Sequence, residues 1–366
     1  MGLVRTILAL CVAAFHSFSI GGLSFTGGKV SVQCFYIISG FYMALILNEK
    51  YLGESFSYLK FIKSRIIRIY PAYFIVMILS FFISLGCLYF WNNPLYLGLF
   101  KPHWKNLSFT TQIILVFENL FLIGQDILFF LKVNFSSGNL EPSISAFTEK
   151  KKLILNGFLF VPQSWTLSIE LCFYFLAPFI VRCSLASKLA IVVISLLARL
   201  YFYSQLKLDI DPWTYRFFPF EIALFTAGTL AFQLYNMIDK LKYSKVLGFI
   251  MLITVVIIIL LYNKIPLGES FKSWGFYLLF SLMLPFIFCF SKNSKIDRLI
   301  GELSYPIYLI HHLIMFLLRQ YFWSHTENMK WFGISTVILS LFAGVFFYMY
   351  VTAPIERYRF RILQKQ

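Results

Sequence analysis

Long runs of apolar residues recur along the chain and are separated by short polar connections. Each run is close to the ~20 residues that an α-helix needs to cross a bilayer. Unbroken runs suit helices better than the alternating strands of a membrane barrel, which are roughly ten residues long. The pattern predicts an all-α polytopic membrane protein of about ten spans, at 3–20, 30–47, 69–90, 165–182, 189–205, 218–236, 246–262, 273–291, 303–321 and 332–352.

One further apolar segment, 111–131, is interrupted by polar side chains. If this segment does not cross, Lys and Arg are concentrated in the connections on the side of the N-terminus; if it crosses, the two sides are balanced. The positive-inside rule therefore favours cytoplasmic N- and C-termini and an amphipathic or re-entrant helix within a long extracytoplasmic loop, 91–164. On this interpretation a single transmembrane domain covers 1–352, and a short basic cytoplasmic tail covers 353–366.

Composition strengthens the membrane assignment. Hydrophobic residues make up 59% of the 366 positions and charged residues 13%, which is more apolar and less charged than soluble domains. The net charge of +16 fits cytoplasmic connections near anionic lipid head groups, so we expect membrane lipids and no nucleic acid as partners. The cysteines show neither paired nor metal-ligand spacing.

Ionisable side chains inside spans are costly and often functional. Arg5 and His16 are about three helical turns apart, so they share one face of the first span and differ by about 16 Å along its axis. A helix-end arginine and a histidine bonded to a neighbouring helix would give the same pattern. Arg65 and Arg68 lie one turn apart at the entry to the third span. Such a guanidinium pair suits phosphates, although an ordinary basic flank is also consistent with it.

A carboxylate, Glu170, lies about one turn inside the fourth span, with Trp165 and Ser168 close by. A buried acid of this kind needs a partner or a function. Glu170 could orient a histidine, bind a sugar hydroxyl, or pair with Arg199 or Arg319 of other spans.

The ninth span carries Tyr305 at its start and two adjacent histidines, His311 and His312, near its middle. Adjacent helical residues diverge by about 100°, and no carboxylate or cysteine stands at ligand spacing, so no metal site is expected. The glycine and aromatic residues of 30–41 in the second span predict a face of close helix packing.

Taken together and in this order, these motifs resemble those of the acyltransferase-3 family of bacterial membrane proteins. The match runs from Arg5 to about Glu356, with Thr166 where serine is usual and Thr352 where relatives often carry a glutamate before Pro354. The residues that carry the resemblance are Arg5, His16, Phe35, Ser39, Gly40, Phe41, Arg65, Arg68, Tyr70, Pro71, Trp165 to Glu170, and Ser304 to His311.

The resemblance implies transfer of an acyl group, usually acetyl from acetyl-coenzyme A, to a hydroxyl of O-antigen, exopolysaccharide or a similar lipid-linked or surface glycan, in the bacterial inner (cytoplasmic) membrane. It makes acyl-coenzyme A a co-substrate and requires no permanently bound cofactor. Arg5, Arg65 and Arg68 would bind the coenzyme A phosphates. The pantetheine arm, on the order of 15–20 Å long, would bring the thioester beside His16.

In this scheme His16 is the general base on the acceptor hydroxyl, and Glu170 orients the base or the sugar. Supporting or substrate-binding roles fall to Ser39, Tyr70, Trp165, Ser168, Tyr305 and His311. The oligomeric state does not follow from the sequence.

Three further expectations concern the reaction class. Many relatives carry an SGNH hydrolase-like domain, and the sequence through Gln366 contains none, so we expect direct transfer or a partner protein. A transporter or flippase for a lipid-linked glycan is an alternative, because Arg199, Glu221 and Arg319 would also suit a substrate pathway. A glycan polymerase is another alternative, although it would not need a cytoplasmic phosphate-binding pair.

Overall fold

The computed structural model describes residues 1–18, 25–51, 57–144, 147, 153–322 and 329–364, and helices lie over all ten predicted apolar runs. These helices are α1 (Gly2–Ser17), α2 (Gly27–Ile46), α3 (Tyr58–Trp91), α6 (Trp165–Arg182), α7 (Leu185–Ser204), α8 (Phe218–Ile238), α9 (Ser244–Leu261), α10 (Glu269–Ser291), α12 (Ser304–Tyr321) and α13 (Met329–Phe347). Within the described part of the chain, 8 helical stretches are long and apolar enough to cross a membrane, and neither α1 nor α8 is among them. The all-α membrane class is confirmed, while ten crossings stay a prediction.

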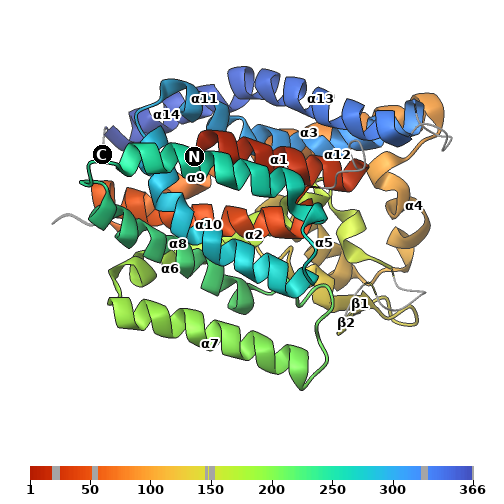
Figure 1. Ribbon diagram of the computed structural model, residues 1–366. Coiled ribbons are helices and arrows are strands. Elements are labelled where there is room, and N and C mark those ends of the chain that lie inside the picture. Colours follow the sequence, from red (N-terminus) through yellow and green to blue (C-terminus); the bar gives the residue numbers. More distant parts are fainter. Residues whose placement is uncertain (19–24, 52–56, 145–146, 148–152, 323–328, 365–366) are drawn as a thin grey trace.

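The helices run roughly along one common direction, so the bundle has two ends (Figure 1). The start of α1 and the C-terminal helix α14 (Ala353–Gln364) lie toward one end, and the segment between α3 and α6 lies at the other. An even number of crossings requires this arrangement of the termini. The cytoplasmic location of the end that holds the termini stays a prediction.

The segment between α3 and α6 is built from short elements. They are η2 (Leu95–Gly98), α4 (Phe100–His103), η3 (Trp104–Asn106), α5 (Phe109–Phe121), η4 (Ile127–Phe130), β1 (Leu131–Val133), β2 (Leu140–Pro142), η5 (Leu155–Phe158) and η6 (Pro162–Ser164). The two strands pair antiparallel, with Leu131 opposite Pro142. A small apolar core of its own, which includes Leu115, Leu128 and Phe158, holds the segment together.

The helix α5 has 13 residues, about 20 Å of helix, which is short of a bilayer core of about 30 Å. Three of its polar side chains, those of Thr111, Glu118 and Asn119, are buried. The side-chain Nδ2 of Asn119 donates to the carbonyl oxygen of Phe158 at 2.9 Å, and the backbone carbonyl oxygen of Asn119 accepts from the hydroxyl of Tyr73 at 2.6 Å. The polar groups of Asn119 are thus satisfied by protein. The amphipathic or re-entrant placement of this segment stays a prediction.

Glycine allows α2 and α8 to approach closely. A Cβ atom on Gly40 would lie 1.9 Å from the carbonyl oxygen of Phe225, and one on Gly228 would lie 2.0 Å from that of Ile37. Real side chains never come so near, so the two helices pack backbone to backbone at this point. The close packing face predicted for 30–41 is confirmed.

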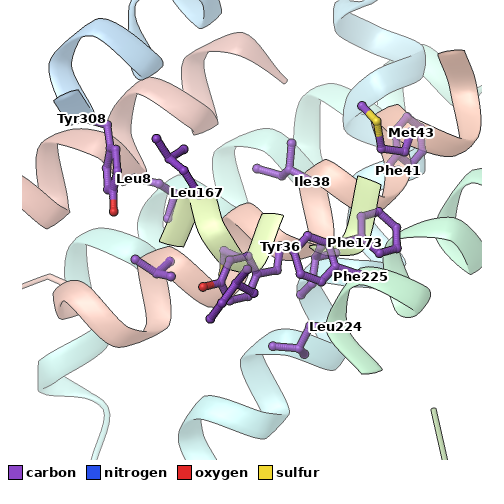
Figure 2. Packing of buried hydrophobic residues seen from close by; sticks show 14 of the residues in the cluster. Leu8, Tyr36, Ile38, Phe41, Met43, Leu167, Phe173, Leu224, Phe225 and Tyr308 are labelled. Atoms are coloured by element: carbon purple, nitrogen blue, oxygen red, sulfur yellow. The ribbon is translucent and has the colours of Figure 1, made fainter. Parts of the chain in front are cut away.

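Aromatic rings fill the centre of the bundle beside this contact. The ring of Phe225 on α8 stacks on that of Phe173 on α6 with centroids 4.2 Å apart, and on that of Tyr36 on α2 with centroids 4.7 Å apart. Figure 2 shows these side chains converging from the three helices. The stack fixes α2 and α6, which carry several of the predicted site residues, relative to each other.

The C-terminal segment, which is predicted to be a short basic cytoplasmic tail, is helical. Residues 353–364 form the helix α14, which follows α13 through the π-helical stretch η9 (Tyr348–Thr352) and packs against α3. Two further elements belong to this end of the bundle: η1 (Leu47–Tyr51) after α2, and α11 (Lys295–Glu302) before α12. The basic side chains of 353–364 therefore lie on a packed helix, and one of them, Arg359, is buried.

Candidate active site

Three histidines meet where α1 and α12 pack together. The ring centroid of His16 lies 5.4 Å from that of His311 and 4.4 Å from that of His312. His311 is completely buried, whereas His16 is exposed. His312 is half-buried, so His16 is the most exposed member of this histidine cluster. The predicted supporting residue His311 lies beside it, and His312 joins the cluster because both rings border His16.

The tautomer of His311 follows from its hydrogen bond. Its Nδ1 lies 2.7 Å from the carbonyl oxygen of Tyr308. Because a carbonyl only accepts, Nδ1 carries the proton and Nε2 keeps a lone pair. Nε2 of His311 and Nδ1 of His312 have no hydrogen-bond partner in the part of the chain that the structure describes. Two buried ring nitrogens are thus free to interact with His16 or with a ligand.

The histidine cluster is also the place in the described residues where a metal ion could be held. One nitrogen from each ring lies within 4.8 Å of the others. Three histidines form a zinc donor set, but tetrahedral ligation would bring the nitrogens to roughly 3.4 Å from one another. The side chains would have to rotate to bind an ion. The sequence argument against a metal considered His311 and His312 alone, and the third histidine comes from another helix.

Hydrogen bonds hold the middle of α12 against the start of α6. The hydroxyl of Tyr308 donates to the carbonyl oxygen of Gln163 at 2.7 Å and lies 2.6 Å from Oγ1 of Thr166. Nε2 of Gln163 donates to the carbonyl oxygen of Leu309 at 2.7 Å. Thr166, which stands where serine is usual, keeps the hydroxyl that makes this contact. The histidine cluster is therefore positioned by a rigid junction between two helices.

Glu170 is hydrogen-bonded to a side chain of α2 and to one of its own helix. Its Oε1 accepts from Oγ of Ser39 at 2.6 Å and from the hydroxyl of Tyr174. No hydrogen bond joins Glu170 to His16 among the described residues. Glu170 also does not pair with Arg199, which binds Glu221 at 2.7 Å. Of the predicted site residues, the structure thus brings Ser39, not His16, to this carboxylate.

Polar side chains form a stripe along the facing sides of α6 and α12. Thr166, Glu170 and Tyr174 recur every four residues on α6, and Tyr305 and Tyr308 are three residues apart on α12, which follows Glu302 at the end of α11. Residues at these spacings share one helix face. Thr166 contacts Tyr308, and Glu170 lies within electrostatic range of Tyr305. This polar stripe leads from the histidine cluster toward the end of the bundle that holds the termini.

At that end the predicted arginines gather around acidic side chains. Nη2 of Arg68 lies 3.9 Å from Oε2 of Glu302, and Nε of Arg68 lies 4.0 Å from Oε1 of Glu356. The guanidinium of Arg5 lies 5.7 Å from the ring centroid of Tyr42 and is also within electrostatic range of Glu302. α1 is an uninterrupted helix, so Arg5 and His16 keep the predicted separation of about 16 Å along its axis.

Arg65 and Arg359 lie at the same end of the bundle, and we call Arg5, Arg65, Arg68 and Arg359 the arginine cluster. Arg65 is 3% exposed and Arg359 is 6% exposed. Each guanidinium is within electrostatic range of Arg68, and Arg65 is also within electrostatic range of Arg359. The sequence analysis singled out Arg65 but not Arg359. The signal for Arg359 was weak, because a basic residue after the last span is an ordinary positive-inside feature.

Trp165 lies at the opposite end of the polar stripe and is stacked on an arginine that the sequence analysis did not single out. The guanidinium of Arg216 lies 4.2 Å from the ring centroid of Trp165 and 4.0 Å from that of Phe129. Nε of Arg216 donates to Asp211 at 2.7 Å. Arg216 is also within electrostatic range of His16. Trp165 therefore serves as a stacking surface for a charged pair near the histidine cluster.

Two of the predicted supporting tyrosines brace α3. The hydroxyl of Tyr70 donates to the carbonyl oxygen of Phe121 at the end of α5. The hydroxyl of Tyr305 donates to the carbonyl oxygen of Ile69 at 2.8 Å. The first bond holds the segment between α3 and α6 and the second holds α12, so both tyrosines position the walls of the site.

Ser168 fixes the turn that follows α5. Its hydroxyl accepts from the backbone nitrogen of Gly124 at 2.9 Å and donates to Asp126 at 2.6 Å. A second acid, Glu118, is also buried in this segment. Burial, with a smaller contribution from the charge of Asp126, raises the pKa of Glu118 to about 8. Burial also raises the pKa of Asp126. The buried position of Glu118 is therefore favoured by protonation of its carboxyl group.

The charges that suited a transporter are largely satisfied within the protein. The carboxylate of Glu221, which pairs with Arg199, also accepts from Nε2 of Gln33 at 3.1 and 3.0 Å. The hydroxyl of Tyr277 donates to Oε1 of the same glutamine. A cavity of about 100 Å³ lies beside this network, and no histidine lines it. Arg319 is exposed.

The fold and the site define an α-helical, multi-pass membrane protein in which a histidine cluster is connected through polar side chains to an arginine cluster at one end of the bundle. The chain belongs to the acyltransferase-3 family, because the family model for an acyltransferase domain matches residues 1–353. The resemblance carried by the sequence motifs is thereby confirmed, and the protein is a membrane acyltransferase. No curated protein and no solved structure matches the chain.

Proposed function

We propose that the protein transfers an acyl group, in the first instance acetyl, from acyl-coenzyme A to a hydroxyl of a lipid-linked or surface polysaccharide in the bacterial cytoplasmic membrane. The proposal rests chiefly on the histidine cluster, in which exposed His16 faces the two ring nitrogens of His311 and His312 that have no partner among the described residues. A histidine whose one nitrogen is held by a neighbour offers its other nitrogen as a base.

In the proposed step, Nε2 of His311 accepts the N–H of His16 and so selects its tautomer. The other ring nitrogen of His16 takes the proton from the acceptor hydroxyl as its oxygen attacks the thioester carbonyl carbon. The carbon–sulfur bond then breaks, and the proton passes from His16 to the leaving sulfur. The products are an ester on the glycan and the free coenzyme A thiol, so atoms and charge balance without a metal or a permanent cofactor.

The donor would enter from the end that holds the arginine cluster. Three guanidiniums predicted to bind phosphate, those of Arg5, Arg65 and Arg68, lie at this end. From Arg5 to His16 the rise along α1 is about 16 Å, which is comparable with an extended pantetheine arm of roughly 15–20 Å. Hydroxyl and carboxylate groups of the polar stripe can hydrogen-bond the two amides of that arm. In this role Glu170 belongs to the donor path.

The glycan would approach from the opposite end, where Trp165, Arg216 and Asp211 lie near the histidine cluster. An aromatic face with charged hydrogen-bonding groups beside it suits a sugar ring. Transfer from thioester to hydroxyl would then be direct, with the two substrates meeting at His16.

The test is transfer of labelled acetyl from acetyl-coenzyme A into host glycan. Membranes that carry equal amounts of wild-type protein, His16→Ala and the control His103→Ala should be compared. His103 lies in α4, outside the site. Label should appear with wild type and His103→Ala and be lost with His16→Ala. Equal labelling by His16→Ala would show that His16 is not the base. Label in no membrane, also with longer acyl donors and native glycan present, would favour a transporter instead.

A further inference from the structure

The arginine cluster contains hydrogen-bond donors that the described residues do not use. Nε and Nη1 of Arg65 and Nε and Nη1 of Arg359 are buried and have no hydrogen-bond partner in the part of the chain that the structure describes. Arg65 comes from α3 and Arg359 from α14, beyond the residues that the family model matches. Two helices far apart in sequence thus direct unused donors into the same region.

Such an arrangement is unfavourable unless an anion binds. A guanidinium does not lose its proton in proteins, and burial of a charge without a partner is unfavourable. The carboxylates present serve mainly the other nitrogens. Glu356 pairs with Nη2 of Arg359 at 2.5 Å and lies 4.0 Å from Arg68, whereas Glu302 lies 3.9 Å from Arg68. These contacts involve Arg68 and Nη2 of Arg359, and among the described residues neither carboxylate forms an ion pair with Arg65.

The position of α14 follows from contacts on two sides. Arg359 is within electrostatic range of Tyr51 at the end of η1, as is Arg65. Nζ of Lys50 lies 5.6 Å from the ring centroid of Phe360, the residue next to Arg359. α14 is thus packed against α3 and lies beside η1, and Arg359 is buried at this junction.

We propose that Arg359 completes, with Arg65 and Arg68, a binding site for a phosphate group of the acyl-coenzyme A donor. Guanidinium groups bind phosphate through paired N–H donors and are preferred for this task. The inference rests on the proposed function for the identity of the donor. It assigns the C-terminal helix a direct part in substrate binding.

Binding of coenzyme A itself tests the site, because it requires neither an acyl group nor a glycan. Titration calorimetry of the full-length protein in neutral-lipid nanodiscs should show Arg359→Gln weakening the Kd for coenzyme A by about 10- to 100-fold, the range for a hydrogen bond to a charged group. The matched control is Arg357→Gln on the same helix, where the side chain is exposed. It should leave the Kd within about threefold of wild type. Pantetheine, which lacks phosphate, should bind wild type and Arg359→Gln equally.

A folded Arg359→Gln protein that binds coenzyme A as wild type does would overturn the proposal. If this variant cannot be recovered folded, coenzyme A binding by Glu356→Gln tests the proposed phosphate site instead. Removal of that carboxylate frees Arg359 and makes the cluster more positive, so coenzyme A should bind more tightly, a gain that misfolding cannot produce. Unchanged or weaker binding by Glu356→Gln would then contradict the site.

A lipid phosphate is the other source of this chemistry. In nanodiscs with anionic phospholipid, a lipid site would appear as stabilisation of wild type but not of Arg359→Gln, with equal coenzyme A binding by both, and this result would overturn the donor assignment. Coenzyme A binding by wild type without acyl transfer to any glycan would contradict the proposed function and leave the phosphate site intact. Loss of transfer in Arg359→Gln with unchanged coenzyme A binding would contradict the phosphate site and leave the proposed function intact.

Discussion

The imidazole of His16 packs against that of His312 with ring centroids 4.4 Å apart and planes inclined at 54°. The register of this contact is set at the other end of α1. The amino group of Met1 binds Asp297 at 2.8 Å, and a Cβ atom on Gly301 would lie 2.6 Å from Cα of Gly2. Because α1 is anchored on α11 in this way, its last turn is carried to the middle of α12, where the histidines meet.

The first prediction concerns His311. His311→Ala should lower kcat for acyl transfer by roughly 10- to 100-fold, because His16 loses the neighbour that selects its tautomer. KM for acyl-coenzyme A should change little, since the arginine cluster is untouched. Steady-state kinetics in proteoliposomes measure both quantities. A variant with wild-type kcat would exclude His311 as a positioning residue.

A second prediction separates base catalysis from metal catalysis at the same three histidines. If His16 acts as the base, transfer should survive exhaustive treatment with a strong zinc chelator, and elemental analysis of the purified protein should find far less than one equivalent of a divalent metal. Activity that disappears with the chelator and returns with added zinc would assign the cluster to a metal instead.

A third prediction concerns the contact between α2 and α8. Gly40→Ala would place a methyl group 1.9 Å from the carbonyl oxygen of Phe225. The helices must move apart, so the free energy of unfolding should fall by about 1–3 kcal/mol. Thermal unfolding in detergent measures the change. Gly86→Ala is the matched control, because nothing lies within 4 Å of a Cβ atom there. Equal stability of the two variants would contradict the close packing.

A fourth prediction concerns pH. Burial raises the pKa of Glu118 from 4.5 to about 8, so the folded protein holds this proton more tightly than the unfolded chain. The contribution of the protonated Glu118 carboxyl to the free energy of unfolding is fully present below the pKa that this group has in the unfolded chain. It is lost as the pH rises through the pKa that the group has in the folded protein. Unfolding temperature should therefore fall between about pH 4.5 and pH 8.

Glu118→Gln keeps a neutral, hydrogen-bonding side chain and should reduce this pH dependence. The variant should be more stable than wild type at pH 8 to 9 and nearly equal to it at pH 5. If the unfolding temperatures of the two proteins change with pH in the same way across this range, Glu118 does not titrate as inferred.

Much of the fold could be predicted from the sequence because the relevant physics is local. An apolar run of about 20 residues must form a helix in lipid, whichever neighbours it has. The separation of Arg5 and His16 follows from helical rise alone. Gly40 indicated close packing because only a residue without a side chain permits it. These features depend on chain geometry and solvent, and the structure agrees with them.

The partners of each polar side chain were decided by tertiary packing. Glu170 was a candidate partner for His16, yet it binds Ser39 and Tyr174, and His311 and His312 stand beside His16 instead. Helices whose surfaces are apolar on nearly every side carry little information about which neighbour they meet. Small-residue contacts and hydrogen bonds between helices decide that order, and they connect residues hundreds of positions apart.

The C-terminal helix shows the same division between local and tertiary information. The sequence by itself determined that 353–366 is basic, and a basic flank after a last span is ordinary. Only the packing of α14 on α3 turned Arg359 inward beside Arg65. Charge is a property of the residue, but burial of that charge depends on which surface the helix meets, and this is settled when the whole bundle assembles.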